Sequence, residues 1–78
     1  MAKMTLKLPK LAVSMQEGTI VEWLVESGAI IAQGDKIYTV ETEKTSFEVE
    51  SPFAGTITIL VPIGETLPIG TPIAQIIS

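Results

Sequence analysis

The chain has 78 residues, which leaves room for one domain, residues 1–78, built on one modest hydrophobic core. It contains no cysteine and no histidine, and this excludes Ser-His and Cys-His nucleophiles, ordinary zinc sites and an unperturbed general base near neutral pH. Nine acidic residues stand against five lysines and no arginine, and the resulting net charge of -4 disfavours nucleic acid as a partner.

The first half of the chain predicts short strands separated by glycine turns. A strand is expected over residues 4–8, where polar and apolar residues alternate, and further strands over residues 17–24 and 36–41, which are rich in β-branched and aromatic residues. Gly28 and Gly34 punctuate these runs, because glycine tolerates the positive φ that tight reversals require. An all-β domain follows from this pattern.

The middle of the chain predicts a hairpin with a polar tip. Residues 41–46 are polar and lie between two strand-like runs, the second of which covers residues 47–50. Tight hairpins favour Asn-Gly or Asp-Gly, whereas this tip offers Glu43-Lys44 in a chain that uses glycine freely elsewhere. A local departure from the structural optimum of this kind points to a function.

The second half of the chain repeats the first. Strands are expected over residues 56–61 and 72–77, and a short strand between the glycines of each half brings the total to about eight. The matched positions are Gly18 with Gly55, Gly28 with Gly64, Gly34 with Gly70, Ile37 with Ile73 and Val40 with Ile76. The repeat predicts a flattened barrel or sandwich of two four-stranded antiparallel sheets with pseudo-two-fold symmetry.

Lys44 is the candidate functional residue, because it alone among the lysines lies at the junction of the two halves. The neighbouring carboxylates, Glu41, Glu43, Glu48 and Glu50, are expected to favour its ammonium form. This argues against a Schiff-base or nucleophilic lysine, which needs burial or a cationic neighbour. An exposed lysine on a rigid mounting suits covalent loading by another protein, and an ordinary solvated turn lysine is the alternative.

The hairpin resembles the lipoyl-attachment motif of the biotinyl/lipoyl carrier-domain family. The matching residues are Glu41-Thr42-Glu43-Lys44-Thr45, then Glu48-Val49-Glu50-Ser51-Pro52 and Gly55. The opening of the chain is similar to the same family at Leu8-Pro9, Met15, Glu17-Gly18-Thr19-Ile20 and Trp23. Together these matches cover nearly the whole chain.

The resemblance implies a non-catalytic carrier in which Lys44 is amide-linked to lipoic acid. Such a swinging arm carries acyl groups and electrons between active sites of a 2-oxo-acid or acetoin dehydrogenase complex. The implied partners are a lipoate ligase or lipoyltransferase, a thiamine-diphosphate dehydrogenase component, an acyltransferase core and a flavin-dependent dihydrolipoamide dehydrogenase. The chain is then compatible with a domain excised from a dihydrolipoyl acyltransferase.

The residues beside the lysine favour lipoic acid over biotin. Biotin carriers usually place Met on both sides of the lysine, whereas Glu43 and Thr45 stand here. The usual lipoyl pattern is Asp-Lys-Ala, so Glu43 keeps the acid and Thr45 enlarges a small residue. Both are candidate recognition residues, although Glu43 equally suits an ordinary turn acid. The resemblance also places the loop of residues 10–16 beside the hairpin, where it would help the thiamine enzyme choose its carrier.

Other functions stay open at this point. A biotin carboxyl carrier domain and a carrier of glycine cleavage share the expected fold, and an unmodified β-barrel interaction domain would need no cofactor. Ile20, Trp23, Val40 and Phe47 are expected in the core rather than at a contact surface. No apolar run approaches the roughly 20 residues of a membrane span and no signal-peptide pattern opens the chain, so we expect a cytoplasmic protein, or a matrix protein in a mitochondrion.

Overall fold

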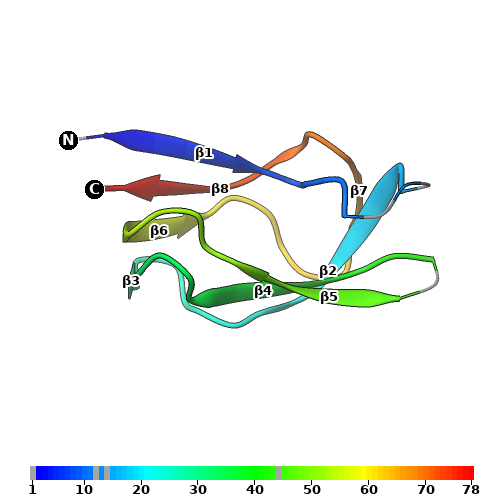
Figure 1. Ribbon diagram of the computed structural model, residues 1–78, viewed down its shortest axis with the longest axis horizontal. Coiled ribbons are helices and arrows are strands. Elements are labelled where there is room, and N and C mark those ends of the chain that lie inside the picture. The colour runs from blue at the N-terminus through cyan, green and yellow to red at the C-terminus, as the bar shows by residue number, and fades with distance from the viewer. Residues whose placement is uncertain (1, 12, 14, 44) are drawn as a thin grey trace.

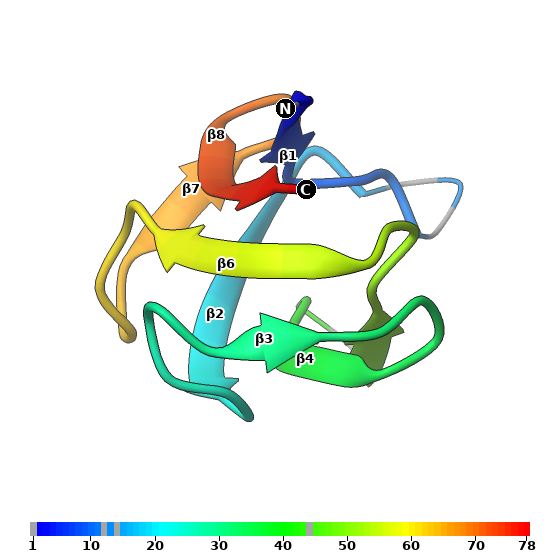
Figure 2. The ribbon, with the colours of Figure 1, turned by 90° about the vertical axis from the view of Figure 1, so that its left-hand side faces the viewer.

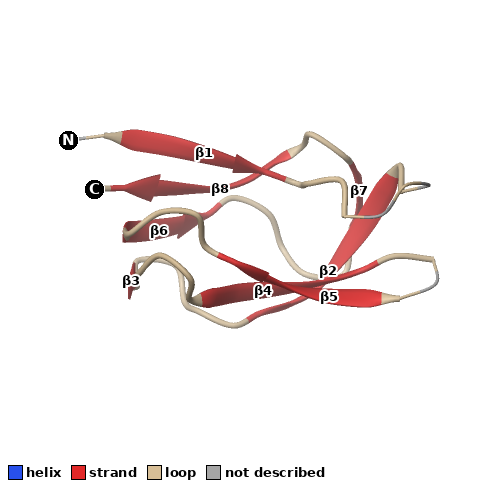
Figure 3. Cartoon of the chain, viewed as in Figure 1, coloured by secondary structure: helices blue, strands red, loops and turns tan. Residues whose placement is uncertain are grey.

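The described part of the chain forms eight strands, which make up its regular structure (Figures 1 and 3). The computed structural model describes residues 2–11, 13, 15–43 and 45–78. The strands are β1 (Lys3–Lys7), β2 (Glu17–Trp23), β3 (Ile30–Ile31), β4 (Lys36–Glu41), β5 (Ser46–Glu50), β6 (Gly55–Ile59), β7 (Thr66–Pro68) and β8 (Pro72–Ile77). The all-β prediction is confirmed, and the six longer strands lie within one or two residues of their expected bounds at either end. No helix in the described part of the chain is long and apolar enough to cross a membrane.

The strands form two four-stranded antiparallel sheets, as the repeat predicts. One sheet has the order β1-β8-β6-β3 and the other the order β5-β4-β2-β7. The two sheets face each other across one hydrophobic core (Figures 1 and 2). Each sheet contains two strands from each half of the chain. The first half contributes β1 and β3 to one sheet, and the second half contributes β5 and β7 to the other, so the two halves interlock.

The strands β4 and β8 supply the centre of the core in the same way. Both bury their second, third and fifth residues and expose the two ends. Two consecutive side chains can point inward because Ile37 and Ile73 have no partner in the neighbouring edge strand, where the register shifts. The side chains buried by these two strands are Ile37, Tyr38, Val40, Ile73, Ala74 and Ile76.

The four expected core residues split into two kinds. Ile20 and Val40 are completely buried, whereas Trp23 and Phe47 are partly buried and pack against the margin of the core. The indole of Trp23 spans the margin, because its Nε1 donates a hydrogen bond to the carbonyl oxygen of Val61 at 3.2 Å.

Hydrogen bonds that recur in pairs show the pseudo-two-fold symmetry. The N–H of Gly28 donates to the carbonyl oxygen of Ile57 at 2.6 Å, and the N–H of Gly64 donates to that of Ile20 at 2.8 Å. Gly28 and Gly64 also share a positive φ, of 93° and 89°, that suits glycine. The two halves of the chain therefore have the same local structure as well as similar sequences, and the predicted repeat is confirmed.

The two ends of the chain and the β4–β5 hairpin occupy opposite ends of the molecule (Figure 1). Backbone hydrogen bonds join Ala2 and Ser78 in both directions, at 3.2 Å and 2.9 Å. The molecule measures 36 × 20 × 18 Å along its principal axes. The hairpin thus projects away from the point where the chain begins and ends.

Candidate functional site

The candidate site is the tip of the β4–β5 hairpin. Val40 pairs with Phe47, and Glu41 pairs with Ser46 directly before the tip. Because Val40 is completely buried between the sheets, the hairpin is anchored in the core two residues before its turn begins. Lys44, the predicted attachment residue, lies outside the described residues.

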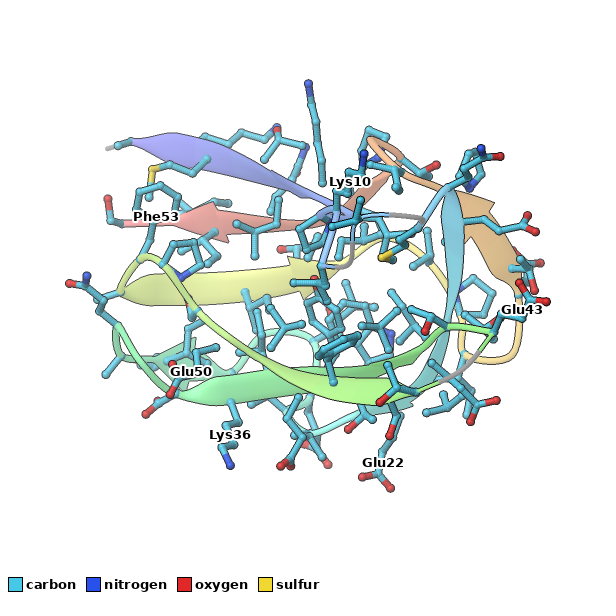
Figure 4. All side chains as sticks on the ribbon, turned by 45° about the vertical axis from the view of Figure 1, so that its right-hand side comes forward. Lys10, Glu22, Lys36, Glu43, Glu50 and Phe53 are labelled. Atoms are coloured by element: carbon cyan, nitrogen blue, oxygen red, sulfur yellow. The ribbon has the colours of Figure 1, made fainter. Side chains whose placement is uncertain are left out.

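The residues on both sides of Lys44 are described, and both are exposed. Glu43 and Thr45, the two candidate recognition residues, are open to solvent. Glu43 points away from the body of the molecule, and Phe53 marks the opposite end (Figure 4). The structure therefore presents the neighbours of the attachment position at one extremity of the long axis.

Thr42 and Thr45 close the turn through three hydrogen bonds. The N–H of Thr42 donates to the carbonyl oxygen of Thr45 at 2.7 Å, and the Thr42 hydroxyl donates to the same oxygen at 3.0 Å. The N–H of Thr45 donates in return to the Thr42 hydroxyl at 3.3 Å. One threonine side chain thus serves as donor and acceptor across a turn whose two central residues are Glu43 and Lys44.

The conformation of this turn explains why it contains no glycine. In the commonest two-residue hairpin turn, both central residues have positive φ. Among the described residues only glycines have positive φ, so Glu43 does not, and the turn is of another type. The turn therefore differs from the type in which Asn-Gly is favoured.

Two of the four carboxylates expected around the tip lie there. Glu41 ends β4 and Glu43 lies in the turn, and both are exposed. Glu48 instead contacts Lys36, with 3.2 Å between its Oε1 and the Lys36 Nζ, and Glu50 pairs with Lys36 at the far end of the hairpin (Figure 4). The prediction was wrong for Glu48 and Glu50, because an extended strand carries each successive residue about 3.3 Å further from the turn.

The described end of the loop of residues 10–16 lies beside the hairpin, as the resemblance implied. Met15 and Gln16 line a shallow surface depression together with residues of the hairpin tip. Met15 is buried, and its Sδ accepts a hydrogen bond from the N–H of Leu11 at 3.3 Å. Ala12 and Ser14, which complete the loop, lie outside the described residues.

Gly18 is the residue that lets this loop pack closely. A Cβ at Gly18 would lie 2.9 Å from the Met15 Cε and 2.8 Å from the Val40 Cγ2, both closer than real contacts allow. Met15 therefore packs over Gly18 of β2 and belongs to the same core cluster as Val40. The sequence indicated Gly18 as part of the repeat but gave no sign of this contact.

Sequence reasoning also missed the role of Thr42 in the turn. Thr42 was considered only as one residue of the attachment motif, although the hydroxyl of a threonine beside a turn can form hydrogen bonds with nearby backbone groups. Among the described residues, no group of three carboxylate or other ligating side chains could hold a metal ion. The arrangement exposes the hairpin tip to solvent and to other proteins, while Val40 anchors the hairpin in the core.

Comparison with known proteins agrees with this geometry. A family model described as biotin-requiring enzyme matches residues 4–76. The chain is 42% identical over 74 residues to the dihydrolipoyllysine-residue acetyltransferase component of the acetoin cleaving system of Pseudomonas putida, covering 94% of this chain and 20% of that protein. It is 44% identical over 77 residues to the lipoamide acyltransferase component of the branched-chain alpha-keto acid dehydrogenase complex of Bacillus subtilis, covering 97% of this chain and 18% of that protein.

A third relative is a component of another complex. The chain is 43% identical over 70 residues to the dihydrolipoyllysine-residue acetyltransferase component of the pyruvate dehydrogenase complex of Zymomonas mobilis, covering 87% of this chain and 16% of that protein. The chain thus spans a fifth or less of the length of these relatives. Because the family model covers nearly the whole chain, the chain belongs to the biotinyl/lipoyl carrier-domain family.

Proposed function

We propose that Lys44 carries lipoic acid in amide linkage and that the loaded domain moves acyl groups and electrons between the active sites of a 2-oxo-acid or acetoin dehydrogenase complex. The observation that carries the proposal is the exposed tip with Glu43 and Thr45 on either side of Lys44, at the end of the molecule opposite Ala2 and Ser78. A covalent arm attached there would reach outward without obstruction from the rest of the domain.

The residues present fit lipoic acid. The chain has no cysteine, so the dithiol and disulfide chemistry of acyl and electron transfer would come from the bound group alone. The domain itself contributes the attachment amine, the exposed turn and the anchoring of that turn through Val40. Holding the arm on a tethered domain replaces free diffusion by a high effective concentration at each active site.

Lipoic acid is favoured over biotin on two grounds. Glu43 and Thr45 flank the lysine where biotin carriers usually have methionine. The relatives are also named for dihydrolipoyllysine or lipoamide chemistry, in the acetoin, branched-chain and pyruvate systems. These relatives belong to different complexes, and the chain is about equally identical in sequence to each of them. The proposal therefore names the class of complex and leaves open which substrate the complex oxidises.

The proposed partners each need the hairpin end of the molecule. A lipoate ligase or lipoyltransferase would load Lys44, with Glu43 and Thr45 as recognition residues. A thiamine-diphosphate dehydrogenase component would then charge the arm, an acyltransferase core would discharge it and a flavin-dependent dihydrolipoamide dehydrogenase would reoxidise it. The loop of residues 10–16, of which Met15 and Gln16 lie beside the hairpin tip, is proposed to help the thiamine enzyme select its carrier.

In this proposal residues 1–78 form one non-catalytic domain of the cytoplasm, or of the mitochondrial matrix in a eukaryote. The catalytic steps belong to other polypeptides or to other parts of a longer acyltransferase, as the small share of each relative that the chain covers suggests. The shared core of the two sheets supports a single folding unit.

Co-expression with a ligase tests the proposal directly. The chain is produced with a lipoate ligase and, separately, with a biotin ligase, and its intact mass is measured. We expect a gain of one lipoyl group with the lipoate ligase, lost in Lys44→Arg and retained in Lys36→Arg. Lys36 is a matched control, since it is an exposed lysine of the same hairpin, with 57% of its side chain accessible.

The contrary outcomes point to the other candidates. Loading by the biotin ligase alone would establish a biotin carrier. No mass gain with either ligase, under conditions that load a known carrier, would leave an unmodified interaction domain.

A further inference from the structure

The pseudo-two-fold symmetry provides an internal reference for the geometry of the hairpin tip. It relates Thr42 to Ser78 and Thr45 to Ala2, because β4 matches β8 and β5 matches β1. At the chain ends, the pair Ala2 and Ser78 exchanges two backbone hydrogen bonds, as an ordinary antiparallel ladder does. The chain ends therefore show the hydrogen-bond pattern of this position in the fold when no turn connects the two strands.

The hairpin tip keeps one of these two bonds and replaces the other. The N–H of Thr42 donates to the Thr45 carbonyl oxygen at 2.7 Å, which corresponds to the Ser78-to-Ala2 bond of 2.9 Å. The bond that corresponds to Ala2-to-Ser78 runs instead from the N–H of Thr45 to the Thr42 hydroxyl, at 3.3 Å. The substitution of a side-chain oxygen for a backbone oxygen sets the tip apart from its symmetry-related position.

The hydroxyl of Thr42 is well suited to this substitution. A hydroxyl is both donor and acceptor, and this one also donates to the Thr45 carbonyl oxygen at 3.0 Å. Thr42 is β-branched, so its side chain has little rotamer freedom to lose when it adopts this arrangement. Thr42 itself is half-buried, whereas Glu43 and Thr45 are exposed.

We propose that Thr42 is a positioning residue for the loading of Lys44, acting through the hydrogen bonds between its hydroxyl and the backbone of Thr45. The inference rests on the proposed function and names the residue that fixes the turn on which the ligase acts. A turn that is closed in advance is recognised without a conformational cost, whereas a loosened turn is competent only part of the time. Partial competence raises the apparent KM for the domain and leaves kcat unchanged.

Two variants of Thr42 and one control separate this role from general stability. Thr42→Val replaces the hydroxyl by a methyl group of similar shape, and Thr42→Ser keeps the hydroxyl. Thr58→Val makes the same chemical change on β6, in the other sheet. Each chain is loaded by a lipoate ligase at varied domain concentration, and amide hydrogen exchange at Thr45 and the urea midpoint are measured on the unloaded chains.

We expect Thr42→Val to raise the KM of loading by up to about fivefold at unchanged kcat, since losing a typical neutral hydrogen bond weakens closure of the turn by about that factor. Exchange of the Thr45 amide should accelerate by a similar factor in this variant. Thr42→Ser should stay within about twofold of the wild type in both measurements, since the hydroxyl that makes the bonds is retained. Thr58→Val should load like the wild type, and any fall in the urea midpoint of Thr42→Val should be small enough that the chain stays fully folded during loading.

The outcomes distinguish the inference from the proposed function. A loaded wild type with an equal KM in Thr42→Val overturns the inference alone, and so does unaltered exchange of the Thr45 amide. A KM that rises equally in the serine variant also overturns it, because the hydroxyl would then be irrelevant. A wild-type chain that the ligase does not load overturns the proposed function and this inference together.

Discussion

Tyr38 is a titratable residue whose buried environment changes its chemistry markedly. It lies in β4 with 2% of its surface exposed, and its ring packs against that of Trp23 with 5.2 Å between centroids. Burial raises the pKa of its hydroxyl from 10.0 to about 12. The neutral form is therefore favoured by folding.

This shift predicts a loss of stability in alkali. Below pH 10 Tyr38 is protonated in both the folded and the unfolded chain, so it adds no pH dependence. Above pH 10 the unfolded chain releases the proton first, and the free energy of unfolding falls as the pH rises towards 12. The contribution amounts to about 2 kcal/mol at pH 12.

Urea unfolding of the wild type and Tyr38→Phe, followed from pH 8 to pH 12, measures this contribution. The difference in unfolding free energy between the two chains should be constant up to about pH 10 and then shift by about 2 kcal/mol in favour of the variant. A difference that stays constant over the whole range would mean that the hydroxyl titrates normally.

The sequence predicted individual residues well where burial decides and poorly where a side chain bonds its local backbone. Ile20 and Val40 were expected in the core from their β-branched runs, and both are completely buried. The role of Thr42 depends on the conformation of the turn, which the pattern of polar residues at 41–46 does not specify. Lys44 remains a prediction, supported by its neighbours and by the family.

At the scale of the elements, the β4–β5 hairpin is stabilised by packing more than by charge. Phe47 packs against the core from the partner strand of Val40. The ion pair between Lys36 and Glu48 is open to water, with 57% and 52% of the two side chains exposed. Exposed pairs of this kind contribute little, because water and salt screen them.

Two hairpin variants should therefore differ strongly in stability. We expect Phe47→Ala to lower the free energy of unfolding by about 2 kcal/mol, since a partly buried aromatic ring is lost. Lys36→Gln should lower it by less than about 0.5 kcal/mol. Urea titrations at low and moderate salt measure both, and a larger loss in the lysine variant would contradict this division.

The strands were predicted from runs of β-prone residues, but their inward faces were not. Simple alternation places Ile37 and Tyr38 on opposite sides of the sheet, whereas both are buried. The bulge that turns both inward depends on the pairing of β4 with β5, where Lys36 faces Glu50 and Tyr38 faces Val49. Such a shift in register depends on contacts between strands and has no signature in either strand alone.

At the scale of the whole molecule, the interlocked halves predict one cooperative unit. The repeat in the sequence predicted two sheets and their pseudo-symmetry, and the structure confirms both. It did not predict that the halves exchange strands, so that each sheet contains two strands from each half of the chain. That exchange depends on hydrogen bonds between distant segments, such as the one from the N–H of Ile57 to the carbonyl oxygen of Ala29 at 3.0 Å.

This exchange should make unfolding a single transition. The chain has one tryptophan, so fluorescence reports on Trp23 in β2, while far-ultraviolet circular dichroism reports on all strands. We expect the two signals to give the same urea midpoint, because neither half can bury its apolar face alone. Separate midpoints would show that one half of the repeat is stable without the other.

The paired ends, Ala2 and Ser78, lie opposite the hairpin tip. The tip would therefore move the furthest if the domain rotated about its ends. Any polypeptide that continues from either end would leave from the base, and rotation about that joint would sweep the tip through an arc whose radius approaches the 36 Å long axis. In the proposed function, this rigid length adds to the span of the flexible arm. The stiffness of the barrel would then extend the working radius of the cofactor without lengthening the linker, whose ordering would cost entropy.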